Sequence, residues 1–293
     1  MTTLRVRMLE DMQIRNLAVN TQESYVRQVS LFARYFNESP ERLGPEQIRA
    51  YQVYLTNEKK LATSSILLAI SALRFLYKIT LKKDWTLEDI IPAPKKPQTL
   101  PVVLSPEEVI EFLACVASRK HRAILTTCYG AGLRVSEAIA LTPPAIDSKR
   151  MVLRVEQGKG QRDRYVMLSP KLLEILRQWW RAERPQHWLF PGDRPGQHIT
   201  IDAVERECQK AHRICKISKP ITPHSMRHAF AVHLLEQGTD VRTIQLLLGH
   251  RSLATTAKYL RIATSKVCAT SSPLDLLPRP VPLEVKPTVS QPF

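Results

Sequence analysis

Two histidines, an arginine and a tyrosine stand close together in the segment that begins TPHSMRHAF and ends ATTAKYL. His224 and Arg227 are three residues apart, so on a helix they share one face. His250 follows a leucine-rich run, and Tyr259 comes nine residues later on a separate short predicted helix. Together with Arg134, far upstream in YGAGLRVSEAIAL, these side chains could hold a phosphate and attack it with a phenol.

Cleavage of a phosphodiester without a metal ion requires three kinds of group. A nucleophile must lie in line with the leaving oxygen, cationic donors must bind the non-bridging oxygens as these gain charge, and the leaving 5′ oxygen needs a proton. Arginine suits the cationic role because its planar fork bonds two phosphate oxygens and keeps its charge. Arg134 and Arg227 are the candidates, and the helix that Pro223 and His224 open adds free N–H groups to the anion site.

Each of these residues also has an ordinary structural explanation when it is taken alone. A single arginine is commonly a surface charge, a histidine after Leu-Gly commonly caps a helix, and a tyrosine at a helix end commonly packs. Lys159, flanked by glycines, could be only a turn residue. The prediction therefore depends on the joint occurrence of these residues in one order. His228, next to Arg227, is expected to face another direction and to be structural.

The charge of the chain favours a polyanionic partner. The 293 residues are 44% hydrophobic and 24% charged, which is typical of a soluble globular protein, but the net charge is +16. Nucleic acid is the first partner that such an excess indicates and an acidic membrane surface the second, while solubility alone is the alternative. Residues 1–103 carry a net charge of +5 and residues 104–272 one of +11, so both parts could contact a phosphate backbone.

Cysteine usage and the N-terminus point to an intracellular location. The five cysteines are an odd number without CxxC spacing, which favours reduced core thiols over a disulfide framework or a zinc site. The N-terminal residues MTTLRVRMLEDMQIR have no apolar stretch typical of a signal peptide, and no run of eighteen apolar residues occurs. We therefore expect a cytoplasmic protein without a membrane partner.

Residues 1–91 are predicted to form a bundle of about four helices. Apolar residues recur at helical spacing after a capping Thr21, from Pro45 onward, and after a capping Thr63. The stretch IPAPKKPQTLP that follows holds four prolines, which block a helix and predict an extended linker over residues 92–104.

A second domain is predicted over residues 105–272. Its start is a capping box made of Ser105, Pro106 and Glu108. Residues 151–168 alternate with period two around a glycine-containing turn, which predicts a small antiparallel β-hairpin in a mainly α fold. Further helices are expected near residues 170–182, 201–214, 225–237, 240–248 and 253–262. The last segment, 273–293, holds six prolines and is expected to be disordered.

Four motifs carry a resemblance to a known family. GAGLRVSEAIAL, GKGQRDRYV, TPHSMRHAFAVHLLEQG and LLGHRSLATTAKYL occur in the order typical of tyrosine recombinases, the phage integrase family, which includes Xer-type, integron and transposon-borne enzymes. The chain resembles this family over roughly residues 4–265. The resemblance implies an N-terminal SAM-like core-binding domain that clamps the other face of DNA, followed by a C-terminal tyrosine-recombinase catalytic domain.

The resemblance also implies a role for each matching residue. A phenol has an unperturbed pKa of ~10, so the positive charge of the arginines and a nearby base must help it to ionise. Because the covalent link conserves the phosphodiester energy, no ATP, cofactor or metal is implied. The resemblance implies that Arg134 and Arg227 clamp the phosphate, that Glu137 is a supporting carboxylate, and that His250 hydrogen-bonds the phosphate. It implies that Lys159 protonates the leaving 5′ oxygen and that His224 assists proton transfer from the tyrosine. Tyr259 is then the nucleophile, which forms a 3′-phosphotyrosyl bond.

The resemblance leaves the product and the biological role open. The favoured hypothesis is a site-specific integrase or recombinase of a mobile element, acting on double-stranded DNA core sites as a homo-tetramer on two synapsed sites, with or without accessory proteins. Relaxation as in a type IB topoisomerase, a DNA-binding relative that has lost catalysis, and a basic RNA-binding protein are the alternatives. One departure concerns the C-terminus. Only about a dozen residues separate Tyr259 from the proline-rich tail, so exchange of this segment between protomers stays open.

Overall fold

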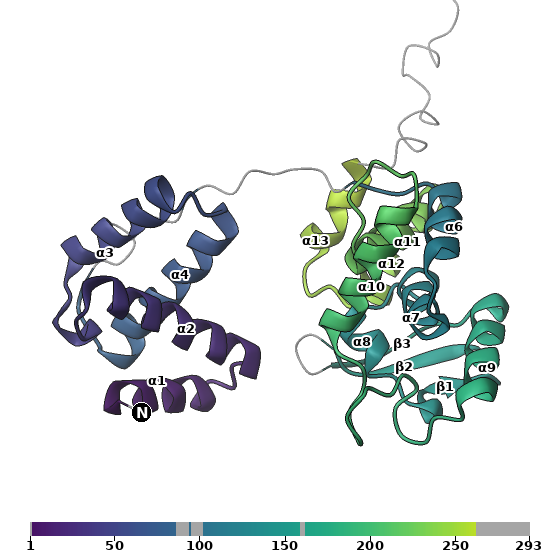
Figure 1. Ribbon diagram of the computed structural model, residues 1–293, viewed down its shortest axis with the longest axis horizontal. Helices are drawn as coiled ribbons and strands as arrows, with labels where there is room; N and C mark the ends of the chain where they lie inside the picture. The colour runs from purple at the N-terminus through teal and green to yellow at the C-terminus, as the bar shows by residue number, and fades with distance from the viewer. Residues whose placement is uncertain (1, 86–93, 95–101, 159–161, 262–293) are drawn as a thin grey trace, which may run out of the picture. The chain divides into compact units, whose positions relative to one another are not determined.

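The computed structural model describes residues 2–85, 94, 102–158 and 162–261. The chain forms two compact units, Met1–Thr99 and Leu100–Phe293, and each is described by itself (Figure 1). Most of the predicted linker and the whole of the predicted tail, 273–293, fall outside the described residues. The predicted domain limits at 91, 104 and 272 therefore stay predictions.

The described part of the first unit is helical, as predicted. Its core gathers Met12, Phe32, Ile48 and Tyr77, and the hydroxyl of Tyr77 donates a hydrogen bond to the carbonyl of Pro40 over 2.9 Å. The elements are α1 (Thr3–Ile14), α2 (Val19–Phe36), a 3₁₀ turn (Pro40–Arg42), α3 (Pro45–Val53) with a π-helical turn (Tyr54–Glu58), and α4 (Thr63–Phe75) with a π-helical turn (Leu76–Thr80).

Two predicted helix caps in this unit are wrong. Helix α2 begins at Val19, and Thr21 already donates its backbone N–H to the carbonyl of Ala18. Helix α4 begins with Thr63 itself, after Ala62. An alanine at the N-cap makes no side-chain hydrogen bond, so the sequence carries no signal of these starts.

One described helix is long and apolar enough to cross a membrane. It is Thr63–Thr80, with a mean hydropathy of 1.2. Its side chains Ile66, Ile70 and Leu73 are buried in the core of the first unit, so the helix packs as the core helix of a folded domain.

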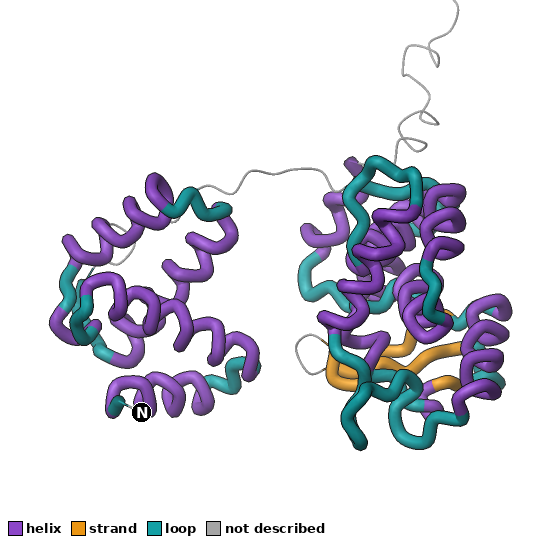
Figure 2. Tube along the Cα trace, viewed as in Figure 1, coloured by secondary structure: helices purple, strands orange, loops and turns teal. Residues whose placement is uncertain are grey.

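The second unit is mainly helical with a small antiparallel sheet, which confirms the predicted fold class. Figure 2 distinguishes the strands (orange) from the helices of this unit. Strand order is β1-β2-β3. The described elements are α6 (Pro106–Cys115), α7 (Arg119–Gly130), α8 (Val135–Ile139), a 3₁₀ turn (Pro143–Ala145), β1 (Ile146–Asp147), β2 (Val152–Gly158), β3 (Arg162–Met167), α9 (Pro170–Glu183), α10 (Ile201–Ile214), α11 (Pro223–Glu236), α12 (Val241–Leu248), α13 (Leu253–Ala257) and a 3₁₀ turn (Lys258–Arg261).

The predicted hairpin is present, and a third strand accompanies it. Leu153 of β2 pairs with Val166 of β3 on one side and with Ile146 of β1 on the other. Strand β1 was not predicted, because two residues are too few to show a period of two. The predicted capping box is confirmed, since the Ser105 backbone N–H donates to Oε2 of Glu108 over 2.7 Å.

Helix α11 organises the core around the site. Pro223 starts it after the N-cap Thr222, as expected from the proline and histidine that open its sequence. Most of its side chains are buried, and it packs against α7, α10 and α12. Helix α8 contacts β2 and helix α12 contacts β3, so the ends of these elements converge near the first turns of α11.

Candidate active site

One cavity of about 280 Å³ in the second unit is lined by five of the residues that the sequence predicted for chemistry. They come from the residue before α8, the first turns of α11, the residue beyond the end of α12, and the 3₁₀ turn after α13. Lys159 lies outside the described residues, so its predicted role stays a prediction. The five are Arg134, His224, Arg227, His250 and Tyr259.

Two glycines in left-handed conformation shape the wall behind the cavity. Gly132 has a φ of 64°, and a Cβ there would lie 2.4 Å from the ring of Phe230. Gly249 has a φ of 62° and ends α12, and a Cβ there would lie 3.1 Å from Arg164. At Gly132 only glycine allows both this backbone conformation and this close approach, while a Cβ at Gly249 would be strained and would press on Arg164.

Arg227 is fastened to both of these turns. Its side chain is 1% exposed, so its charge and its donors need partners inside the protein. Nη1 donates to the carbonyl of Gly132 over 2.6 Å, and Nη2 donates to the carbonyl of Leu248 over 2.5 Å. Oε2 of Glu137 lies 3.6 Å from Nη1. The Nε–H is buried without a partner, so one donor of the guanidinium is unused.

Glu137 links three arginines around the cavity. It accepts hydrogen bonds from the backbone N–H of Arg134 over 2.9 Å and from Nη1 of the same residue over 2.7 Å. Arg164 adds two parallel hydrogen bonds to the carboxylate, at 3.0 and 2.8 Å. Burial opposes ionisation of Glu137, but these bonds and the arginine charges outweigh it and lower its pKa to about 2.

Arg164 was not predicted as a site residue, although its motif GKGQRDRYV was singled out. It lies on β3, and its Nε donates to the carbonyl of Leu247 in α12 over 3.0 Å. It therefore holds Glu137 and the end of α12 in one arrangement. The sequence gives no sign of this, because the partners are 27 and 83 residues away.

His250 has a defined tautomer. Its Nε2 lies 3.3 Å from Nη2 of Arg227, and a guanidinium can only donate. Nε2 must therefore be the acceptor, so Nδ1 carries the proton and donates it to Oγ1 of Thr256 over 2.8 Å. Burial, with the charges of Arg227 and Arg134, lowers the pKa of His250 to about 3. Thr256, which is 1% exposed, is a further residue that the sequence did not indicate.

The hydroxyl of Tyr259 is hydrogen-bonded to His228. Nδ1 of His228 lies 2.8 Å from the phenol oxygen, and the two ring centroids are 5.6 Å apart. The expectation that His228 faces another direction is therefore wrong. Its signal was present in the sequence, because residues 224 and 228 are four apart and share a helix face. Burial raises the pKa of Tyr259 to about 12, and burial with neighbouring basic groups lowers that of His228 to about 3.

His224 lies one turn earlier on α11 and is exposed at the edge of the cavity. Its ring is 4.4 Å from the ring of His228, at an interplanar angle of 75°. His228 thus contacts both the ring of His224 and the phenol of Tyr259. Partial desolvation and the charge of Arg227 lower the pKa of His224.

The lining of the cavity is strongly cationic. Arg251 and Lys258 join Arg134 and Arg227, and the described lining residues include no carboxylate. Nζ of Lys258 lies 5.2 Å from the centre of the Tyr259 ring. Such a cavity, with hydroxyl groups beside guanidinium donors, suits an oxyanion such as a phosphate diester.

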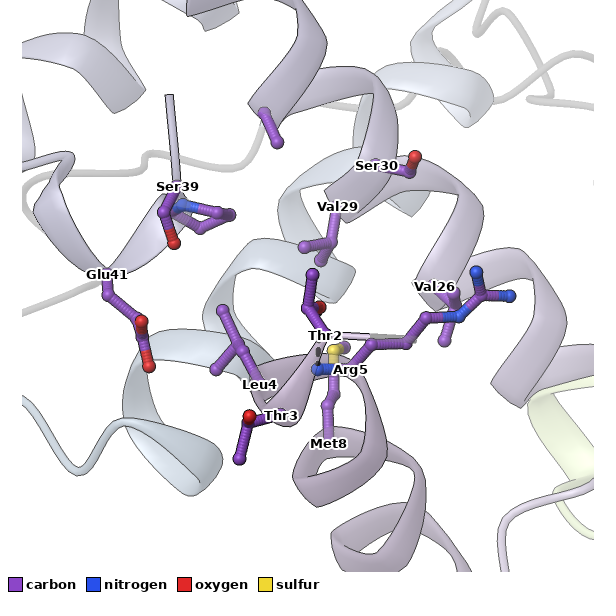
Figure 3. Close-up of a pocket in the computed structure, with 12 residues that line it drawn as sticks. Thr2, Thr3, Leu4, Arg5, Met8, Val26, Val29, Ser30, Ser39 and Glu41 are labelled. Atoms are coloured by element: carbon purple, nitrogen blue, oxygen red, sulfur yellow. Dashed lines mark hydrogen bonds between the residues drawn. The ribbon is translucent and has the colours of Figure 1, made fainter. Parts of the chain in front are cut away.

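A larger cavity in the first unit has a different character. It measures about 950 Å³ and lies between the N-terminal turn of α1, helix α2 and the 3₁₀ turn. Figure 3 shows its lining of short polar and apolar side chains, among them Leu4, Met8 and Val29, with Arg5 and Glu41 as charged groups of opposite sign. This mixture does not provide an anion site, and the chemistry is assigned to the smaller cavity.

Comparison with known proteins decides the family. The phage integrase family matches residues 103–266, and its N-terminal SAM-like domain matches residues 4–87. The chain belongs to the phage integrase family. It is a tyrosine recombinase, as the four motifs predicted.

Relatives and solved structures cover most of the chain. A Sinorhizobium fredii protein, provisionally named integrase/recombinase y4qK, is 70% identical over 96% of this chain and 92% of its own length. The tyrosine recombinase XerD of Lacticaseibacillus casei is 31% identical over 87% of this chain and 92% of its own. A lambda integrase dimer bound to a COC′ core site has a TM-score of 0.73 at 18% identity, over 92% of this chain and 97% of that one, and shows the same fold.

Proposed function

We propose that this tyrosine recombinase cleaves and rejoins duplex DNA at specific sites through a covalent 3′-phosphotyrosyl intermediate on Tyr259. The observation that carries the proposal is the cavity in which this tyrosine lies beside four cationic side chains, with no carboxylate among the described lining residues. The phenol oxygen forms a bond to phosphorus, and the bond from phosphorus to the 5′ oxygen breaks. Family membership supports this chemistry over the alternatives raised by the sequence.

The site residues divide the work of this step. Arg134 and Arg227 bind the non-bridging oxygens, and Glu137 orients both arginines through the contacts described above. Lys159 protonates the leaving 5′ oxygen, a role that rests on the motif alone. His224, exposed at the edge of the cavity, takes part in proton transfer from the phenol.

His250 contributes a hydrogen bond to the phosphate. In the protein without DNA its Nε2 accepts from Arg227, so this nitrogen must gain a proton before it can donate to a phosphate oxygen. A phosphate diester brings a negative charge, which favours the protonated imidazole. Binding of the phosphate and protonation of His250 therefore support each other.

The partner is double-stranded DNA. Both main segments of the chain are basic, and solved structures of the same fold include a lambda integrase dimer bound to a core site and the recombinase XerH bound to difH DNA. We infer a homo-tetramer on two synapsed sites, acting in the cytoplasm. The 70% identical integrase/recombinase relative favours the movement of a mobile element over relaxation of supercoils.

A covalent-trapping gel tests this proposal. Nicked duplexes from the genomic neighbourhood of the gene are incubated with wild-type protein or with Tyr259→Phe, without metal, and then denatured. We expect a shifted band with wild type alone, and the released strand should carry a 5′ hydroxyl that polynucleotide kinase labels directly. Trapped sequences that converge on one site indicate a recombinase, whereas scattered sequences indicate a topoisomerase. Intact DNA binding without any covalent band would contradict the proposal.

A further inference from the structure

The hydrogen bond between His228 and Tyr259 joins the nucleophile to the core helix of the domain. Tyr259 follows α13, a helix of five residues, and lies in a 3₁₀ turn. Elements this short hold a side chain poorly by themselves. Helix α11, in contrast, is buried along most of its length and is packed on four helices, α6, α7, α10 and α12.

Two kinds of contact fix the phenol of Tyr259 against α11. Its ring is 1% exposed and lies in a cluster with Phe230 and Leu235 of this helix and Leu248 of α12. These apolar contacts fix the ring and the oxygen that it carries, but leave the O–H bond free to rotate about the Cζ–Oη bond. The hydrogen bond of 2.8 Å to Nδ1 of His228 supplies that direction.

Arg227 and His228 are neighbours on α11, so one helical turn reaches two parts of the cavity. Arg227 is bonded to the turns at Gly132 and Leu248, which form the wall behind the phosphate site. His228 is bonded to the nucleophile. The distance between phosphate clamp and phenol is therefore set by a rigid helix and not by the short segment that carries the tyrosine.

We propose that His228 is a positioning residue that accepts the O–H of Tyr259 and so holds the phenol oxygen with its lone pairs free to attack the scissile phosphate. The inference rests on the proposed function, because it gives His228 a role in the reaction of that same tyrosine. The imidazole acts through the phenol and is not among the described residues that line the cavity. The pKa of Tyr259 is raised to about 12 and that of His228 is lowered to about 3, so the proton stays on the phenol while the hydrogen bond between them is present.

The geometry of the bond allows a matched set of variants. The contact uses Nδ1, which is bonded to Cγ of the imidazole. In asparagine the amide oxygen, which can also accept a hydrogen bond, is bonded to the same carbon. His228→Asn should therefore keep the hydrogen bond, whereas His228→Gln moves the amide one bond further and His228→Ala removes it. Single-turnover cleavage of a nicked duplex should fall about 10- to 100-fold in the alanine and glutamine variants, and remain near wild type in His228→Asn.

Binding and folding are measured on the same variants. DNA affinity and the thermal unfolding temperature should change little in His228→Asn, which keeps the test valid if His228→Ala unfolds. Wild-type cleavage by His228→Ala, or recovery by glutamine but not by asparagine, would overturn the proposal. Absence of covalent complex in the wild type would instead refute the proposed function.

A chemical nucleophile separates positioning of the tyrosine from assembly of the phosphate site. In a Tyr259→Phe background, hydrogen peroxide can attack the phosphorus, so that an oxygen–phosphorus bond forms and the 5′ oxygen leaves with a proton. Adding His228→Ala to Tyr259→Phe should leave this peroxide-dependent cleavage unchanged, because His228 acts only through the phenol. A fall of tenfold or more would overturn the inference and assign His228 to the phosphate site.

Discussion

At the scale of single residues, the site depends on buried polar groups, such as Arg227 and Glu137, whose hydrogen-bond partners lie far away in the sequence. The spacing of His224 and Arg227 correctly predicted that both reach one cavity. It did not predict that Arg227 is bonded to two backbone carbonyls, because those partners are 95 and 21 residues away. His228 was set aside although its spacing from His224 placed it on the same face. Sequence spacing identifies a shared face, but only the fold identifies what that face meets.

Replacing Arg227 should cost both activity and stability. Arg227→Ala removes a phosphate donor, which typically lowers cleavage ~10²–10³-fold. It also leaves the carbonyls of Gly132 and Leu248 without their donor, at about 1–3 kcal/mol of unfolding free energy for each buried group. Single-turnover cleavage and urea unfolding measure the two effects.

Arg134→Ala is the matched control that separates the loss of cleavage from the loss of stability. Its side chain is 20% exposed and is bonded to Glu137, so cleavage should fall to a similar extent with a smaller loss of stability. Equal stability of Arg227→Ala and wild type would show that the carbonyl contacts of Arg227 do not support the fold.

Thr256 should control the tautomer of His250. Thr256→Val keeps the shape of the side chain but removes the oxygen that accepts the Nδ1 proton. We expect cleavage to fall about tenfold, since one buried hydrogen bond is worth ~1 kcal/mol and the alternative tautomer places a proton toward Arg227. Nitrogen-15 NMR of His250 reports the tautomer directly. Thr256→Ser retains the hydroxyl and should behave like wild type, and an unchanged tautomer in Thr256→Val would contradict the argument.

At the scale of elements, the apolar spacing predicted most of the helices and the hairpin but not their junctions. The helix predicted over 253–262 is instead a five-residue helix, Leu253–Ala257, followed by a 3₁₀ turn that carries Tyr259. Helices α2 and α4 start after alanines, which give no capping signal, and β1 is too short to be recognised. The ion pair between Glu137 and Arg164, beside the cavity, also joins two different elements. Glu137 of α8 and Arg164 of β3 meet across 27 residues of sequence and bring α12 beside them through Leu247.

This junction predicts a loss of stability in acid. The pKa of Glu137 is about 2 in the folded protein and ~4.3 in an unfolded chain, so its carboxylate stabilises the fold at pH values above the unfolded pKa. That contribution, roughly 3 kcal/mol at most, disappears as the pH falls from about 4.3 to about 2. Unfolding free energies measured across this range should fall more steeply for wild type than for Glu137→Gln. Parallel curves for the two proteins would show that the ion pairs are not stabilising.

At the scale of the whole molecule, the net charge of +16 favours a polyanionic partner, and the fold brings the residues of the cationic cavity together. Both compact units belong to parts of the chain with net positive charge, and the family match extends over both. The class of fold and the family were predictable, because four motifs in order carry more information than any one residue. The geometry of the cavity was not, since every hydrogen bond of Arg227 crosses between elements.

DNA binding should depend strongly on salt. If the two units together neutralise six to ten phosphates, affinity should fall ~10³–10⁵-fold between about 50 and 200 mM monovalent salt. Fluorescence anisotropy with Tyr259→Phe measures this without cleavage. Wild type should give the same slope before any covalent complex forms. An affinity that does not respond to salt would contradict contact with the phosphate backbone.

The most direct test of the central claim is to identify the residue that becomes linked to DNA. The covalent complex formed on a nicked duplex is digested with protease and nuclease, and the nucleotide-bearing peptide is sequenced by mass spectrometry. The account predicts a single modified residue, Tyr259, carrying the phosphate of a 3′ nucleotide. Attachment at any other residue, such as the exposed Tyr165 or one of the cavity histidines, would contradict it.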